Sequence, residues 1–151
     1  MAIKYLIGDA TNPTGNGIKI ITHITNDLGF WGKGFVLALS KKWSQPEEEY
    51  RKLRLCDRWL GNVQFIQVEP DIYVANMIAQ HGIGPYGSNQ PPIRYEALRI
   101  CLQKVNEFAN VHNASIHMPR IGTGLAGGLW EFIEPIINDT MSVDVYVYDL
   151  K

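Results

Sequence analysis

The chain has 151 residues, the size of one ordinary globular domain. With 46% hydrophobic and 19% charged residues, it lies outside the composition of disordered chains. The formal net charge is −1 and residues of both signs are interspersed, so the chain lacks the basic stripe that neutralises a nucleic-acid backbone. We therefore expect a single domain over residues 1–151 that does not bind nucleic acids strongly and non-specifically.

Two cysteines, Cys56 and Cys101, lie far apart and form no CxxC pair, which is typical of a reducing compartment. The N-terminal sequence lacks a signal-peptide pattern, and no apolar run approaches the ~18 residues of a membrane span. We expect a cytoplasmic protein without a membrane partner. The four histidines lack the paired spacing of metal ligands, so we expect neither a metal nor another cofactor.

The apolar pattern predicts strands and helices that alternate along the chain. The clearest helix spans Tyr95 to Ala109, where apolar residues recur at helical spacing. We expect strands over Ile3–Ile7, Ile18–Ile24, Val63–Val68, Ile72–Met77, Ser115–Met118 and Val143–Leu150. We expect helices over Phe35–Trp43, Pro46–Leu55, Tyr95–Ala109 and Trp130–Met141.

This order predicts an α/β fold with a mixed sheet covered by helices on both faces. Ligands of such folds lie beyond the carboxyl ends of the strands, where the connecting loops gather. The loops expected there are Asp9–Gly17, Asn26–Gly34, Asn76–Gly87 and Pro119–Gly128. The segment from Gln80 to Pro92, rich in Gly, Pro, Ser and Asn, is expected to be a lid that selects the leaving group.

The strongest local signal is the glycine-rich loop Pro119–Gly128, between a strand and a helix. Glycines let the backbone approach a ligand closely, and the amides of such a loop and of a helix N-terminus attract phosphate. The loop therefore predicts a diphosphate cradle, although a plain tight turn remains an alternative.

Gly122–Gly127 also fits G-x-G-x-x-G, which keeps an NAD-binding Rossmann-type oxidoreductase as an alternative. Against it, the motif lies near the C-terminus, with no following β-α-β unit to complete the sheet.

A second glycine-rich bend, Leu28–Gly34, also joins a strand to a helix. Lys33 does not make it a Walker motif, because Gly34 follows where Ser or Thr is required. Two such bends are suited to gripping opposite sides of one diphosphate.

Three polar residues lie at predicted strand ends. Asn26 is placed to hydrogen-bond a sugar diol, or is a turn residue. Asp9 is placed to accept a hydrogen bond from an adenine amine, or is a cap. His23 lies within an apolar strand, where a histidine is often a satisfied core residue.

Together these segments resemble the macrodomain family over nearly the whole chain. The matching segments are Gly8–Thr11, His23–Gly34, Tyr73–Met77, Met118–Trp130 and Val147–Leu150. The most similar branch contains the terminal ADP-ribose protein glycohydrolase, the yeast ADP-ribose-1″-phosphate phosphatase and antitoxin macrodomains acting on ADP-ribosylated DNA. The resemblance implies a three-layer α/β/α fold with a mixed sheet of about six strands.

The resemblance also implies roles for particular residues. Asp9, with the backbone near Ala10, would recognise adenine, and Tyr148 would border it. Asn26 would bind the distal ribose, and His23 becomes a functional residue. The walls of the diphosphate site would be Gly32, Lys33 and Gly34 on one side, and Pro119, Ile121, Gly122, Thr123, Gly124, Leu125 and Ala126 on the other.

The chain departs from the glycohydrolase of this branch at two positions. That enzyme has an acidic residue where this chain has Ala126, and a lysine near the strand end that here reads Asn76–Gln80. Its lysine–aspartate route is therefore not expected.

We expect a protein that binds ADP-ribose or a derivative, free or attached to protein or nucleic acid. One hypothesis is an enzyme that hydrolyses a phosphate, acyl or other group from the distal ribose. In it, His23 acts as general acid, base or nucleophile, Asn26 orients the ribose and Lys33 assists electrostatically. The other hypothesis is a non-catalytic ADP-ribose reader.

Overall fold

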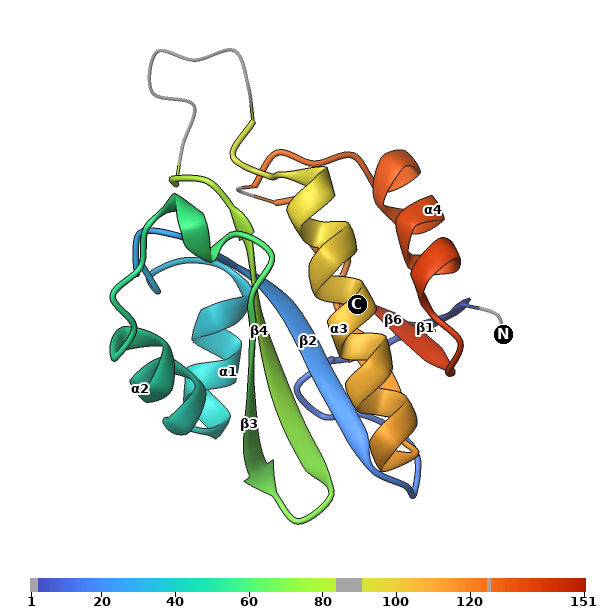
Figure 1. The fold of residues 1–151 in the computed structure, drawn as a ribbon. Coiled ribbons are helices and arrows are strands. Elements are labelled where there is room, and N and C mark those ends of the chain that lie inside the picture. The colour runs from blue at the N-terminus through green and yellow to red at the C-terminus, as the bar shows by residue number, and fades with distance from the viewer. Residues whose placement is uncertain (1–2, 84–90, 125) are drawn as a thin grey trace.

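The computed structural model describes residues 3–83, 91–124 and 126–151. Its strands form one six-stranded sheet, and helices pack against it (Figure 1). The strands are β1 (Ile3–Ile7), β2 (Lys19–Asn26), β3 (Val63–Glu69), β4 (Ile72–Gln80), β5 (Ser115–Met118) and β6 (Val145–Asp149). The helices are α1 (Phe35–Lys42), α2 (Gln45–Arg51), α3 (Tyr95–His112), α4 (Trp130–Thr140) and the short 3-10 helix η1 (Asp57–Trp59).

The strand order is β1-β6-β5-β2-β4-β3, which confirms the mixed sheet. Every neighbouring pair is parallel except β3 and β4, which are antiparallel. This order is not that of a Rossmann half-sheet, in which consecutive strands extend outward from the first. The Rossmann alternative is therefore wrong.

The helices form two layers, one on each face of the sheet, as expected. The larger buried cluster packs α3 and α4 against the sheet and includes Leu98, Leu102 and Ile133. The smaller cluster packs α1 and α2 on the other face and includes Leu39 and Tyr50. In the part of the chain that the structure describes, no helix has the length and apolar character needed to span a bilayer.

The structure differs from the expected elements mainly at strand and helix ends. β4 continues beyond Met77 to Gln80, because Asn26 of β2 pairs with Gln80 and Gln80 also bridges to Ile93. α2 ends at Arg51, and the chain beyond it turns so that Leu53 and Leu55 pack against the smaller cluster.

Backbone hydrogen bonds join residues 79–81 to residues 92–94, on either side of the segment 84–90. The amide of His81 donates to the carbonyl of Pro92 at 2.8 Å, and the amide of Arg94 donates to the carbonyl of Ala79 at 2.8 Å. Most of the expected lid lies outside the described residues, so its proposed role stays a prediction.

Candidate functional site

A cleft lies at the carboxyl ends of the parallel strands, where the loops of the fold converge. Two adjoining cavities of about 380 and 330 Å³ share Ile24, Lys33, Val36 and Gln80, so they form parts of one cleft. We call the part beside Tyr148 the first cavity and the part beside Asn26 the second cavity.

Most of the residues predicted from the sequence line this cleft. Those in the first cavity are His23, Lys33, Gly34, Pro119, Ile121, Gly122, Thr123, Gly124, Ala126 and Tyr148. Asn26, Gly32 and Lys33 line the second. Asp9 and Ala10 line neither cavity, and Leu125 lies outside the described residues. The ligand contacts of all these residues stay predictions.

Sequence reasoning missed several lining residues. The first cavity is also lined by Phe35, Val36, Gln80, Arg120 and Asp149, and the second by Phe30 and Ile83. Arg120 and Phe30 lie inside the glycine-rich loops, so their position in those loops was the available signal.

One wall of the cleft is the bend that leads into α1. Gly34 caps the helix with a φ of 80°, a conformation that side chains other than glycine rarely adopt. The first turn of α1 carries no acidic residue and receives no side-chain cap. Within residues 3–83, 91–124 and 126–151, a Cβ placed on Gly32 or Gly34 would meet no atom within 4 Å, so this wall borders open space.

The facing wall is the loop that precedes α4. Gly122 has a φ of 75°, and a Cβ on it would lie 2.6 Å from Cδ1 of Ile93. The amide of Gly128 donates to the carbonyl of Gly122 at 2.7 Å, which closes the base of the loop. Gly124 lies nearer the tip, and a Cβ there would meet none of the described residues within 4 Å. The loop is thus tightly packed at its base and open at its tip.

His23 is buried within β2, with 2% of its surface exposed. Its Nε2 lies 2.5 Å from Oδ1 of Asn76. The amide nitrogen of Asn76 donates to the carbonyl of Pro46 and to Oε1 of Gln64, both at 3.2 Å, so Oδ1 is left to accept from His23. Nε2 therefore carries the proton.

The other ring nitrogen of His23, Nδ1, is buried and has no hydrogen-bond partner among the described residues. Burial lowers the pKa of His23 from its ordinary value to about 4. The ring is therefore neutral at pH 7, because it has lost the hydration that stabilises the charged form. A neutral ring with a free Nδ1 lone pair can accept a proton or a hydrogen bond, but it cannot act as a general acid at pH 7.

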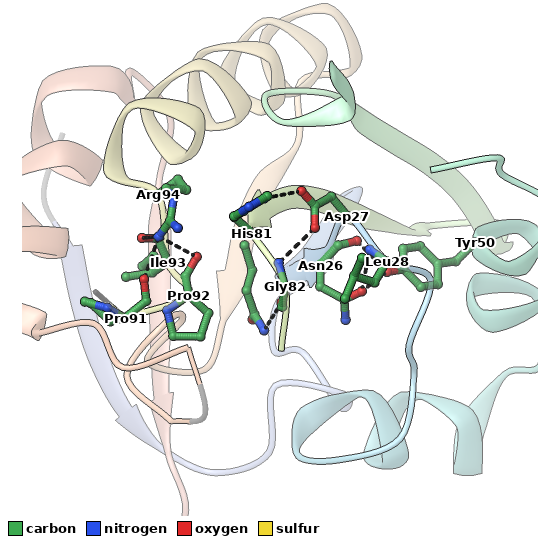
Figure 2. Close-up of polar contacts among 11 residues, drawn as sticks. Asn26, Asp27, Leu28, Tyr50, His81, Gly82, Pro91, Pro92, Ile93 and Arg94 are labelled. Atoms are coloured by element: carbon green, nitrogen blue, oxygen red, sulfur yellow. Dashed lines mark hydrogen bonds and ion pairs between the residues drawn. The ribbon is translucent and has the colours of Figure 1, made fainter. Parts of the chain in front are cut away.

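Asn26 holds the bend that follows β2 (Figure 2). Its Oδ1 accepts hydrogen bonds from the amides of Leu28 at 3.0 Å and Phe30 at 3.1 Å, and its Nδ2 donates to the carbonyl of Phe30 at 2.7 Å. The hydroxyl of Tyr50 lies 2.9 Å from the same Oδ1. The side chain thus fixes one edge of the second cavity.

The next residue, Asp27, joins the ends of β2 and β4. Its Oδ2 lies 2.7 Å from Nδ1 of His81, and its Oδ1 accepts from the amide of Gly82 at 2.9 Å (Figure 2). The Asp27 amide donates to the carbonyl of Gln80 at 3.0 Å. The sequence analysis assigned Asp27 no role.

The opposite end of the cleft is built around Tyr148. Its hydroxyl accepts a hydrogen bond from the amide of Thr14 at 3.0 Å, and its ring lies against Gly8. Asp9, between them in sequence, is exposed, and its Oδ1 accepts from the amide and the hydroxyl of Thr11, both at 2.8 Å.

Arg120 forms a bidentate ion pair with Asp149 at the rim of this end. Nε and Nη2 of Arg120 lie 2.6 and 2.9 Å from the two carboxylate oxygens, and the guanidinium lies over the rings of Tyr5 and Trp130. The pair lowers the pKa of Asp149 from its ordinary value. It also ties the loop before α4 to the end of β6.

Cations and metal ligands in the cleft are sparse. Lys33 is exposed and forms no ion pair within residues 3–83, 91–124 and 126–151. The described residues contain no group of three or more His, Cys, Asp or Glu side chains that could hold a metal ion.

The sheet and the two helical layers define a three-layer α/β/α domain with a cleft at its strand ends. The chain is 47% identical to a macrodomain protein of Streptomyces coelicolor, over 98% of this chain and 99% of that one, with a TM-score of 0.81. A protein of unknown function from Bacteroides thetaiotaomicron is 55% identical over 99% of this chain and 98% of its own, with a TM-score of 0.90. The chain belongs to the macrodomain family.

Curated relatives are more distant. The chromodomain-helicase-DNA-binding protein 1-like of Danio rerio is 32% identical over 91% of this chain, which spans only 14% of that relative's length. The ADP-ribose 1''-phosphate phosphatase of Candida albicans is 27% identical over 96% of this chain and 99% of its own length. No protein-family model matches the chain.

Proposed function

We propose that the cleft binds ADP-ribose or a derivative of it. The observation that carries this proposal is the pair of glycine-lined walls, with open space beside Gly32, Gly34 and Gly124. Uncapped amides of a helix N-terminus and of a glycine loop bind phosphate oxygens without a basic side chain. A diphosphate between the walls is therefore compatible with a net charge of −1.

The dimensions of the cleft support the same ligand. Two adjoining cavities of about 380 and 330 Å³ suit an elongated ligand with a diphosphate between two larger groups. We place adenine near Tyr148 and Asp9, and the distal ribose near Asn26. The phosphatase relative from Candida albicans is named for a substrate of this chemical class.

Substitution by alanine of the glycines that border open space tests the proposal directly. Gly32 and Gly124 have no positive φ and room for a Cβ, so Gly32→Ala and Gly124→Ala should leave the free energy of unfolding within about 1 kcal/mol of the parent. Because each added methyl enters the space assigned to the diphosphate, the affinity for ADP-ribose should fall about tenfold or more.

Gly17→Ala is the matched control, since Gly17 also has room for a Cβ but lines neither cavity. Isothermal titration calorimetry measures the affinity of the three variants for ADP-ribose. The same method measures the affinity of the parent for NAD. The proposal fails if the parent does not bind ADP-ribose, or if the control weakens binding as much as the other two.

A second candidate function is hydrolysis of a group on the distal ribose. It is favoured by Nδ1 of His23, which has no hydrogen-bond partner in the described part of the chain. His23 lines the first cavity, and in this function its Nδ1 would take a proton from an attacking water. The fixed amides of the facing loop would stabilise negative charge that develops on the substrate.

Turnover of ADP-ribose-1″-phosphate, O-acetyl-ADP-ribose and ADP-ribosylated protein or DNA tests this function. If any is hydrolysed, His23→Gln should lower kcat by about 10²–10⁴-fold, and a loss below about tenfold would exclude His23 as the base. Binding of ADP-ribose without turnover of any of them would identify a reader.

A further inference from the structure

A second buried histidine, His117, lies behind the Tyr148 end of the cleft. It is on β5 with none of its surface exposed, and its ring stacks on Tyr146 at 4.9 Å. Its Nδ1 lies 2.7 Å from the hydroxyl oxygen of Tyr148, and its Nε2 lies 2.7 Å from Oγ of Ser115. His117 lines neither cavity of the cleft.

The direction of these hydrogen bonds follows from the backbone. The amide of Thr14 can only donate, so the Tyr148 oxygen accepts at 3.0 Å. Among the described residues, Nδ1 of His117 is the group that can accept the Tyr148 proton, so we assign Tyr148 as the donor and Nδ1 as the unprotonated acceptor. Nε2 carries the ring proton and donates to Ser115. Burial lowers the pKa of His117 to about 3, which agrees with a neutral ring.

This chain of hydrogen bonds connects the core to the loop that holds Asp9. Tyr148 lines the first cavity, its hydroxyl holds Thr14, and its ring lies against Gly8. Gly8 and Thr14 flank Asp9 in sequence. The Tyr148 side chain therefore contacts both ends of the loop that carries Asp9.

We propose that His117 is a positioning residue for the base-binding end of the cleft: by fixing the Tyr148 hydroxyl, it holds the Gly8–Thr14 loop so that Asp9 meets the amine of adenine. The inference rests on the proposed ADP-ribose function. A phenylalanine at this position would keep the stack on Tyr146 and leave the Tyr148 proton without its acceptor. The Gly8–Thr14 loop would then lose its fixed anchor, while the diphosphate walls would keep theirs.

Two measurements on His117→Phe test this role. The first is amide hydrogen exchange at Thr14 without ligand, which should accelerate about tenfold or more because its acceptor is no longer held. The second is the ratio of affinities for ADP-ribose and its hypoxanthine analogue, inosine-diphosphate-ribose, which lacks the amine. This ratio should fall about fivefold, the size of one net hydrogen bond.

Tyr148→Phe removes the hydroxyl that bonds to His117, so it should also accelerate Thr14 exchange and lower the affinity ratio. In the double variant, both effects should be no larger than in either single variant. Tyr146→Phe is the matched control, because it removes a hydroxyl from the ring stacked on His117 and should change neither measurement.

The outcomes separate the two proposals. If the parent binds ADP-ribose and neither measurement changes in His117→Phe or Tyr148→Phe, the inference is overturned. Faster Thr14 exchange with an unchanged affinity ratio also overturns it, because the link would then be structural only. A parent that does not bind ADP-ribose overturns the proposed function, and with it the assignment of this end to a base, even where Thr14 exchange accelerates.

Discussion

The carboxylate of Asp27 and the imidazole of His81 join two neighbouring strand ends at the second cavity. Asp27 is almost fully buried, with 1% of its side chain exposed, whereas half of the His81 side chain is exposed. A buried carboxylate is stable only when donors satisfy its oxygens, and here His81 and the amide of Gly82 supply them. The pair therefore holds the Asn26 edge of the cavity against the Gln80 edge.

His81→Ala should lower the free energy of unfolding by about 1–3 kcal/mol, because it leaves one Asp27 oxygen buried without its donor. It should also weaken ADP-ribose binding, since the two edges of the second cavity would separate. Urea denaturation and titration measure the two effects. His81→Gln, whose amide can still donate, should recover part of both losses. Unchanged stability in His81→Ala would show that the contact contributes nothing.

Tyr50→Phe should lower the free energy of unfolding by about 1 kcal/mol, because the Tyr50 hydroxyl lies within hydrogen-bond distance of the carbonyl oxygen and Oδ1 of Asn26. Chemical denaturation measures the change. Tyr73→Phe serves as the control, since the part of the chain that the structure describes shows no hydrogen bond to the Tyr73 hydroxyl. An equal effect in both variants would contradict a specific contribution from Asn26.

Gly122→Ala should be severely destabilising, by about 2 kcal/mol or more. The residue has a φ of 75°, and the new Cβ would lie 2.6 Å from Ile93 and 3.1 Å from both Ile133 and Ile24. Thermal unfolding midpoints of Gly122→Ala and Gly124→Ala compare two glycines of the same loop. Similar midpoints for the two variants would show that the loop base is not tightly packed.

Stability should fall as the pH is lowered through the weakly acidic range. Burial holds the pKa of His23 at about 4 and of His117 at about 3, whereas both are about 6.5 when unfolded. Between about pH 6.5 and these values the unfolded chain binds more protons, so the free energy of unfolding decreases with falling pH. Each histidine contributes at most about 1.4 kcal/mol per pH unit, and neither contributes above about pH 6.5.

Denaturation curves from pH 7.5 to 4.5 measure this dependence. His117→Phe should flatten the slope over that range because it removes one of the two titrating groups. A slope identical to the parent's would mean that the proton uptake occurs elsewhere.

Much of the fold could be predicted from local pattern. The apolar stripe along α3 and the β-branched runs of β2 and β4 reflect burial on one or both faces, which is a local property of the sequence. The strand ends were missed at Asn26 and Gln80, because these polar residues extend their strands by pairing with each other and, for Gln80, with Ile93.

The glycine-rich loops of the cleft were visible because an unusual backbone conformation demands glycine locally. The side-chain contacts that hold these loops in place could not be predicted from the sequence. Asp27 and His81 are 54 positions apart, and His117 and Tyr148 are 31 apart, so neither pair has a local signature. The burial of His23 depends on Trp31 and Phe35 folding back over its ring, which the strand alone does not reveal.

Backbone hydrogen bonds join His81 to Pro92 and Arg94 to Ala79. The chain between these residues is therefore a suitable place for an inserted sequence. These bonds join the described residues before position 84 to those after position 90, so these two stretches of chain are held together by their own backbone hydrogen bonds. Foreign sequence inserted between residues 83 and 91, such as a reporter peptide, should leave the domain folded.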